Sequence, residues 1–424
     1  MRYSLTYFAS YVFSLLGNSI AAIALPLVVL QSTGSVLGAG TVAAATAIPA
    51  FLAGIFMGVV IDRINRRTSS VVTDMLSAAA VAALPFIDLF TDLSVGLFVL
   101  FGVLGSLGDI PGQTAREALL PAIVARSGLS KERLLGIRES IGAGVLVVGP
   151  AIAGTLVALL EGSSVLWVTA GTSLVAALIT FTIPRRLGAI TAATDASDAS
   201  APRSAVHQFR EGWSTLVRSR ILLLLTAISL VSGVVLASFQ GLVLPVHFTV
   251  VDETALLGFV LSALAVGLLI GSGIYAVLAK PGGARAAWLR TGMIGATAGF
   301  LVIATLHSTP LILIGAFVVG LGSGLFGGLL GVLSLEHIPD TLRGRVMGTQ
   351  NALLSLAPGI GIMGAAALTE AWSLQGAAVV IAALWAVLTV VALLAARPRD
   401  LRPVVAQAPV DHPSQPGADR QAAR

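Results

Sequence analysis

The chain has 424 residues, of which 56% are hydrophobic and only 11% are charged, and its mean hydropathy is +0.95. Soluble domains carry about 25% charged residues, so this composition excludes a soluble globular enzyme, a disordered chain and a coiled coil. The absence of cysteine excludes disulfides, zinc–thiolate sites and cysteine nucleophiles. A stretch of about 20 apolar residues can cross a bilayer as a helix, so we predict an all-α integral membrane protein.

Twelve apolar stretches recur along the chain, each bounded by charged or turn-forming residues. We predict spans at 5–30, 36–61, 68–90, 94–117, 134–160, 164–184, 219–248, 254–279, 286–306, 309–335, 345–370 and 373–396. The first span is too long for the apolar region of a cleaved signal peptide, and no small-residue cleavage site leads into polar chain after it. We therefore predict twelve transmembrane helices.

The positive charges are distributed on one side of these spans. With twelve alternating spans, all 25 lysine and arginine residues fall on the same side of the membrane. The opposite loops contain only acidic charges, at Asp88, Asp92, Glu161, Asp252, Glu253 and Glu370. Because cytoplasmic loops are enriched in Lys and Arg, we expect both termini in the cytoplasm. The same bias supports the count of twelve and explains the basic net charge without nucleic-acid binding.

The spans divide into two sets of six, within residues 1–184 and 219–396. Residues 185–218 form a cytoplasmic linker between the two sets, and residues 397–424 are a proline-containing tail that we expect to be disordered. Two six-span sets with a long link are typical of secondary transporters whose site lies between the halves.

The second part of the linker has apolar residues at helical spacing beside arginines. These residues are Val206, Phe209, Trp213, Leu216 and Val217, with Arg210, Arg218 and Arg220. The pattern favours either an amphipathic helix on the inner leaflet or a plain extension of the next span.

A charged motif joins the second and third spans, with the sequence Gly58-Val-Val-Ile-Asp62-Arg63-Ile-Asn-Arg66-Arg67. Asp62 lies at the C-terminal end of the second span, where the helix dipole disfavours an acid, so a cationic partner such as Arg116 is expected. The motif resembles the signature loop of the major facilitator superfamily, and the resemblance covers residues 1–396. It implies two pseudo-symmetric six-helix bundles, and a charge latch at the inward gate that involves Asp62, Arg63 and Arg116. The alternative is that these arginines only anchor the topology at the headgroups.

Other charges at the cytoplasmic ends of the spans are candidates for the same gate. Glu139 begins the fifth span, and Glu336 closes the tenth. Arg343 and Arg345 lead into the eleventh span, at the position that corresponds to Arg116 in the first half. We expect them to form gate or headgroup ion pairs.

The fifth span contains Gly149-Pro150-x-x-x-Gly154. A proline inside a helix removes one hydrogen bond and bends the helix. The Gly-Pro pair resembles the antiporter motif of facilitator-superfamily exporters, although Ala153 stands where a second glycine is usual. The alternative is a kink with no directional meaning.

Several short stretches resemble the bacterial twelve-helix exporter branch that includes the enterobactin exporter and macrolide efflux pumps. They are Leu25-Pro26-Leu27, Thr33-Gly34-Ser35, Arg116-Glu-Ala-Leu-Leu-Pro121, Phe209-Arg-Glu-Gly212 and Leu342-Arg-Gly-Arg345. This resemblance implies a location in the bacterial inner membrane. Two departures concern proton coupling, since neutral Asn18 stands where the branch commonly has an acid, and the middle of the fourth span lacks the arginine of many proton-driven relatives.

Asp109 is the deepest acid within a span. Arg116 lies two helical turns away and can share a face, so one interpretation of Asp109 is a salt bridge with Arg116 or another cytoplasmic arginine. The other is a carboxyl that takes and releases a proton as the cavity alternates. Uncharged polar residues near mid-span are candidates to line a cavity, or to bond between helices. They are Asn18, Ser232, Gln240, Ser262, Ser323, Asn351 and Ser355.

The sequence has no Walker loop, no cluster of metal ligands and no catalytic Ser/His/Asp set, so we expect neither an enzyme nor a cofactor or metal. From the resemblance we expect proton-coupled efflux of lipophilic or amphipathic small molecules, such as drugs, siderophores or secondary metabolites, by alternating access. The expected partners are this substrate, protons and membrane lipid, and the chain is expected to act as a monomer. The alternatives are an uptake symporter of the same fold and a membrane receptor or scaffold without transport.

Overall fold

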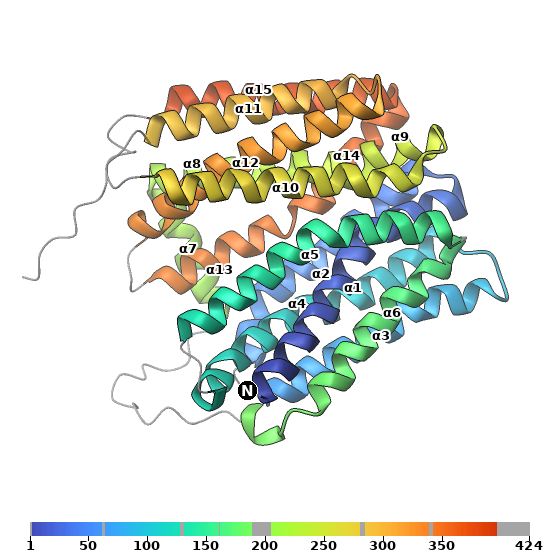
Figure 1. Cartoon of the computed structure of the whole chain (residues 1–424), viewed down its shortest axis with the longest axis vertical. Helices are drawn as coiled ribbons and strands as arrows, with labels where there is room; N and C mark the ends of the chain where they lie inside the picture. The colour runs from blue at the N-terminus through green and yellow to red at the C-terminus, as the bar shows by residue number, and fades with distance from the viewer. Residues whose placement is uncertain are drawn as a thin grey trace, which may run out of the picture.

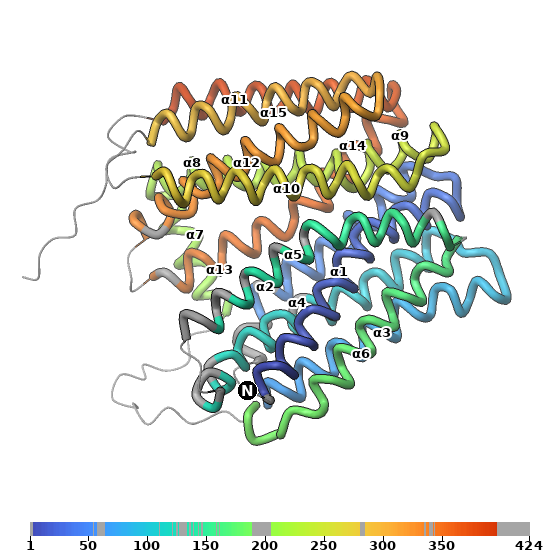
Figure 2. The backbone as a smooth tube through the Cα atoms, viewed as in Figure 1, coloured from blue at the N-terminus to red at the C-terminus, as the bar shows by residue number. Residues whose placement is uncertain are grey.

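The structure is a computed structural model that describes residues 2–61, 64–127, 131–160, 162–188, 205–279, 285–338 and 342–396 (Figure 2). Every regular element in these ranges is helical. The elements are α1 (Arg2–Thr33), α2 (Val36–Ile61), α3 (Arg66–Asp88), α4 (Val95–Ser127), α5 (Lys131–Leu159), η1 (Gly162–Ser164), α6 (Val165–Phe181), η2 (Arg185–Gly188), α7 (Ala205–Arg218), α8 (Arg220–Ser238), η3 (Phe239–Val243), α9 (Leu244–Val250), α10 (Thr254–Leu278), α11 (Arg285–Ala304), α12 (Thr309–His337), α13 (Arg343–Leu354), α14 (Ala357–Ala371) and α15 (Leu374–Ala395).

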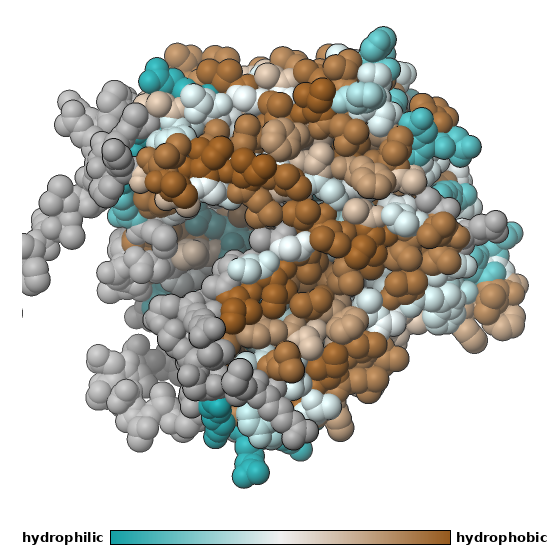
Figure 3. Space-filling model, in the orientation of Figure 1, coloured by the Kyte–Doolittle hydropathy of each residue, from teal (hydrophilic) through white to brown (hydrophobic). Residues whose placement is uncertain are grey.

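Twelve helical stretches in these ranges are long and apolar enough to cross a membrane, which confirms the predicted fold class and the number of spans. Large apolar side chains cover the outer surface of the helices, as the brown areas in Figure 3 show. Val277 and Leu394, for example, are 82% and 81% exposed. Such side chains are costly in water and favourable in lipid, so this surface is suited to the bilayer.

Two of the predicted spans are interrupted near their middle. The seventh span consists of α8, the π-helical turn η3 and α9, and Pro245 stands at the start of α9. The eleventh consists of α13 and α14, which are separated at Ser355 and Leu356 just before Pro358. Proline has no N–H to donate to the preceding turn and clashes with it, so each span changes its helical geometry at this point.

The helices gather into two groups that follow one another along the chain (Figure 1). In the first group, α1 packs on α5 and α6, and α3 packs on α4 and α6. In the second, α10 and α11 pack on α12, and α14 packs on α8 and α15. The N-terminus, η2 and α7 lie at one end of the long helices, which we call the linker end (Figure 1).

The two groups meet where α5 contacts α10 and where α2 contacts α13 and α14. A Cβ atom built on Gly154 would lie only 2.7 Å from the backbone nitrogen of Gly258, so neither helix has room for a side chain there. Ser262 Oγ donates a 2.7 Å hydrogen bond to the carbonyl oxygen of Val147. Gly359 of α14 packs equally closely against α2. We call these α5–α10 and α2–α14 contacts the seam; they lie in the halves of the membrane spans away from the linker end.

Candidate functional site

A cavity of about 460 Å³ lies at the boundary between the two groups. Its described walls come from α1, α2, α3 and α4, with Ser355 from the break between α13 and α14 and Pro358 from the first turn of α14. The lining residues are Asn18, Ala21, Ala22, Leu25, Ala43, Thr46, Ala47, Ala50, Val81, Leu84, Phe101, Gly102, Gly105, Ser106, Asp109, Gln113, Ser355 and Pro358. Most of these side chains are small or apolar, so the cavity can hold a lipophilic molecule without burying many charges.

Asp109 is the one ionisable group among these lining residues. Its Oδ1 atom accepts a 2.7 Å hydrogen bond from Ser77 Oγ, which extends from α3. This hydroxyl fixes the orientation of the carboxyl at the cavity wall. The site therefore contains one carboxylate that can accept a proton or pair with a cation.

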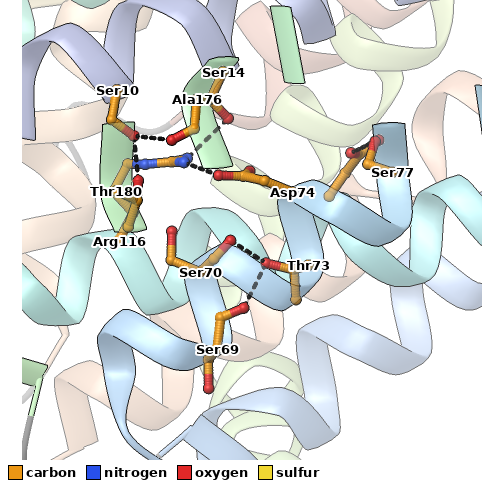
Figure 4. A network of polar contacts seen from close by, with 11 residues as sticks. Ser10, Ser14, Ser69, Ser70, Thr73, Asp74, Ser77, Arg116, Ala176 and Thr180 are labelled. Atoms are coloured by element: carbon orange, nitrogen blue, oxygen red, sulfur yellow. Dashed lines mark hydrogen bonds and ion pairs between the residues drawn. The ribbon is translucent and has the colours of Figure 1, made fainter. Parts of the chain in front are cut away.

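A buried ion pair joins Arg116 to Asp74 in the first group (Figure 4). Arg116 of α4 is 3% exposed, and its Nη2 atom contacts Oδ2 of Asp74 on α3 at 2.5 Å. Its Nη1 atom donates a 2.8 Å hydrogen bond to Ser14 of α1. Nearby, Ser10 of α1 is hydrogen-bonded to Thr180 of α6. A guanidinium with these partners is neutralised inside the bundle and ties three helices together.

These contacts bear on the first interpretation of Asp109, the salt bridge, and not on the second, the proton-carrying carboxyl. Arg116 pairs with Asp74 and Ser14, so a salt bridge between Asp109 and Arg116 is wrong, whereas a pair with another cytoplasmic arginine stays a prediction. The spacing along α4 was compatible with the pair with Arg116, but Asp74 on the neighbouring helix takes the guanidinium instead. The role of Asp109 in proton transfer stays a prediction.

The described gate charges at the linker end find partners inside their own group. Arg66 donates to the carbonyl oxygen of Ala118, and Arg67 donates to those of Phe181 and Ile183. These bonds hold the start of α3 against α4 and the end of α6.

The second group shows the same behaviour. Arg285 forms two hydrogen bonds of 2.7 Å to Glu336, which joins α11 to α12. Arg345 of α13 bonds to Glu211 of α7 at 2.7 Å. These ion pairs thus hold the helices of the second group together and tie α7 to it. Figure 3 shows the surface recessed between the groups on the linker side.

Five other predicted gate residues fall outside what the structure describes. Asp62 and Arg63 lie outside the described residues. Gly58, Glu139 and Arg343 belong to described helices, but their contacts lie outside the description. Their roles stay predictions.

The residues of the antiporter-like motif lie at and beside the seam. A Cβ atom built on Gly258 would approach the carbonyl oxygen of Pro150 to 2.7 Å, and Gly154 faces Gly258 directly. Gly149 faces Ser19 of α1 within the first group. The motif therefore supplies a proline and the small residues where α5 meets α10.

The predicted cavity-lining residues separate into three sets. Asn18 and Ser355 line the cavity, whereas Ser262 spans the seam. The other four, which the structure also describes, are outside this lining: Ser232, Gln240, Ser323 and Asn351. A second depression, of about 600 Å³, lies beyond the seam at the opposite end and is lined by Asp252 and Glu253.

Sequence reasoning missed Ser77 and the pairing of Asp74. Ser77 is one helical turn from Asp74, and α3 and α4 are consecutive antiparallel spans. The sequence therefore indicated that α3 and α4 are neighbours. It did not indicate which side chains meet, because that depends on the rotation of each helix about its axis. In the described residues, no group of three or more His, Asp or Glu side chains could hold a metal ion.

Comparisons with known proteins agree with this architecture. The profile of the family described as Major Facilitator Superfamily matches residues 7–280 and 242–420. The multidrug efflux pump Tap of Mycolicibacterium fortuitum is 32% identical over 91% of this chain and 93% of its own length. Macrolide efflux protein A of Streptococcus pyogenes is 22% identical over 84% of this chain and 87% of its own length.

The fold also resembles solved structures. The crystal structure of the nucleoside transporter NupG superimposes with a TM-score of 0.73, covering 93% of this chain and 99% of that chain at 13% identity. At this identity the likeness concerns the fold alone.

Proposed function

This chain belongs to the major facilitator superfamily of membrane transporters, and from that premise we propose that it exports lipophilic or amphipathic small molecules in exchange for protons. The observation that carries the proposal is the cavity, whose largely apolar wall includes one carboxylate, Asp109. Such a wall suits neutral or weakly charged apolar substrates, since a multiply charged one would leave its charges unpaired. The names of the drug-efflux relatives support the same substrate class.

Alternating access would require the two groups to rock about the cavity. The seam adjoins the cavity at Ala43 and Ala47, and the recess lies at the linker end. We assign the linker end to the cytoplasm because all lysines and arginines fall on that side of the twelve spans. The chain would then lie in the bacterial inner membrane with both termini inside, and would work as a monomer.

The charges at the linker end would form the inward gate. In this proposal Asp62 and Arg63 latch the gate when the linker end closes, and the neighbouring ion pairs keep each group rigid. Gly149, Pro150 and Gly154 support export, because they shape the part of α5 that reaches the seam.

Asp109 would carry the proton. Its carboxyl lines the cavity and has a hydroxyl partner in Ser77, while Arg116 is occupied by Asp74. Asp109 has no cationic partner among the residues that the structure describes, and such a carboxyl in an apolar wall can exchange a proton each time the cavity faces the other side.

The proposal is tested by flux in proteoliposomes under an imposed pH gradient, with a panel of lipophilic compounds. Asp109→Asn should reduce pH-driven flux by about 5–150-fold, the range of a typical coupling free energy. Glu370→Gln removes an exposed carboxyl at the other end of the molecule and should leave flux unchanged. If Asp109→Asn keeps the full pH dependence, another group carries the proton.

Two alternatives have different outcomes in vesicles. An uptake symporter would accumulate substrate in right-side-out vesicles, whereas an exporter accumulates it in everted ones. A receptor or scaffold without transport would show no flux in liposomes under any gradient.

A further inference from the structure

The linker helix α7 has two different apolar faces. Leu216 is buried against Leu222, Ile338 and Val346, so this face belongs to the core of the second group. The other face is exposed, although it consists largely of bulky apolar side chains: Val206, Trp213 and Val217 are 56%, 44% and 48% exposed.

An arginine interrupts the exposed face. Arg210 lies four residues after Val206 and three before Trp213, so all three side chains, with Val217, form one stripe along the helix. Arg218 extends the positive charge at the end of α7. The acid of this helix, Glu211, points to the other side, where it pairs with Arg345. The exposed face is thus apolar and cationic.

The position of α7 continues the surface that faces lipid. Figure 1 shows α7 running across the linker end of the long helices rather than alongside them. It leads directly into the span that begins with α8, where Leu223 is 44% exposed. Arg220, at the start of α8, donates to the carbonyl oxygen of Ala395, next to the highly exposed Leu394.

The same helix is tied firmly to the second group. A Cβ atom built on Gly212 would lie 2.5 Å from the carbonyl oxygen of Arg345, so α7 and α13 are in direct backbone contact. Thr349 donates to the carbonyl oxygen of Phe209. On the first group, α7 packs against α2, where the rings of Phe209 and Phe51 lie 6.0 Å apart. A force on α7 therefore acts on α13 first and reaches the boundary between the groups.

We propose that α7 is a docking site for anionic phospholipids of the linker-side leaflet, and that their occupancy controls transport through α13. Trp213 and Val206 insert among the acyl chains near the headgroups, and Arg210 pairs with a lipid phosphate. Anionic headgroups are favoured because the exposed charge of the face is positive. The control of transport rests on the proposed function, whereas the docking does not.

Docking is tested by tryptophan quenching in proteoliposomes of phosphatidylcholine and phosphatidylglycerol, with bromine on the acyl chains of one lipid at a time. The signal of Trp213 is the difference between the wild type and Trp213→Phe. Brominated phosphatidylglycerol should quench this signal more than its share of the lipid predicts, by up to about fivefold for one arginine. Arg210→Gln should remove that preference, and Arg290→Gln, which changes an exposed arginine of α11, should retain it.

Equal quenching by both lipids would overturn the specificity for anionic lipid. Quenching of Trp213 by water-soluble acrylamide alone would overturn the docking itself and indicate a face that awaits a soluble partner.

The link to transport is tested with Glu211→Gln, which weakens the bond between α7 and α13 and leaves the exposed face intact. Wild-type flux should rise with the proportion of phosphatidylglycerol, and Glu211→Gln should lose this dependence while keeping the quenching pattern. A variant that keeps the dependence would overturn the control through α13. If the wild type shows no flux in any lipid, the proposed function fails, and the quenching still decides the docking.

Discussion

A single hydroxyl group, that of Ser77, orients the carboxyl of Asp109 at the wall of the cavity. The neighbouring Asp74 has a different environment, since a buried guanidinium neutralises it. Two acids on adjacent helices are thus given different tasks by their partners: one remains available to the cavity, and the other stabilises the bundle.

The partner of Asp109 can be tested by removing the hydroxyl. Ser77→Ala should slow flux by about fivefold or more while the dependence on pH remains, because the carboxyl is still present but no longer oriented. Ser106→Ala is a matched control, since Ser106 also lines the cavity but bonds to Val103 of its own helix. An equal effect of the two variants would contradict an orienting role for Ser77.

The buried ion pair should matter for stability. Asp74→Asn leaves the Arg116 guanidinium uncompensated in the bundle and should lower the free energy of unfolding by about 3 kcal/mol or more. Thermal unfolding in detergent measures the effect. Glu117→Gln breaks an ion pair with Arg138 in which Glu117 is 56% exposed, and should cost at most about 1 kcal/mol. Comparable losses in the two variants would show that the buried pair is not special.

Sequence reasoning identified three residues of the cavity wall, Asn18, Asp109 and Ser355, because polar groups within apolar spans are rare enough to stand out. It could not identify Ser77 or the partner of Arg116, since these depend on the rotation of one helix against another. Short-range spacing along α4 even favoured the wrong pair.

At the scale of the helices, the spans follow directly from apolar length, and their number was predicted correctly. The interruptions in the seventh and eleventh spans were not predicted, although Pro245 and Pro358 mark both. Apolar length alone does not distinguish a continuous helix from two segments, because neighbouring helices can satisfy the freed backbone groups.

The linker helix shows a similar limit. One of the two interpretations of α7, the amphipathic helix, groups its periodic apolar residues on one surface, but Leu216 faces the protein core while Trp213 and Val217 are exposed. The spacing of apolar residues in the sequence shows that a helix is amphipathic. It does not show which of its apolar residues are covered by protein and which stay exposed.

The contact of α5 with α10 leads to a prediction about the seam. Gly154→Leu should hold the helices apart and abolish flux, because the leucine would overlap the backbone at Gly258. Gly144→Leu adds the same side chain to the same helix, where nothing lies within 4 Å of the Cβ position, and should retain flux.

The separation can be followed by chemical labelling. The chain has no cysteine, so an Ala151→Cys change introduces a unique thiol in the seam. An impermeant maleimide should reach it from the end opposite the linker faster in Gly154→Leu than in the parent. Unchanged labelling, together with retained flux, would show that the seam tolerates separation.

For the whole molecule, the orientation proposed from the positive charges can be tested in intact bacteria. A thiol introduced by Glu370→Cys should react with an impermeant maleimide from outside, whereas one introduced by Arg186→Cys should react only after the cells are opened. Both side chains are exposed, so accessibility to solvent does not separate them. Labelling of the second site in intact cells would reverse the orientation and the assignment of the gate.

The two groups contribute unequally to the cavity wall, since all but two of its described lining residues belong to the first group. A bound molecule would therefore travel with that group while the other moves past it. Substitutions in the first 113 residues could then alter which compounds are transported without changing the helices of the second group. A chimera that joins the first six spans of one relative to the last six of another should inherit the drug spectrum of the first parent.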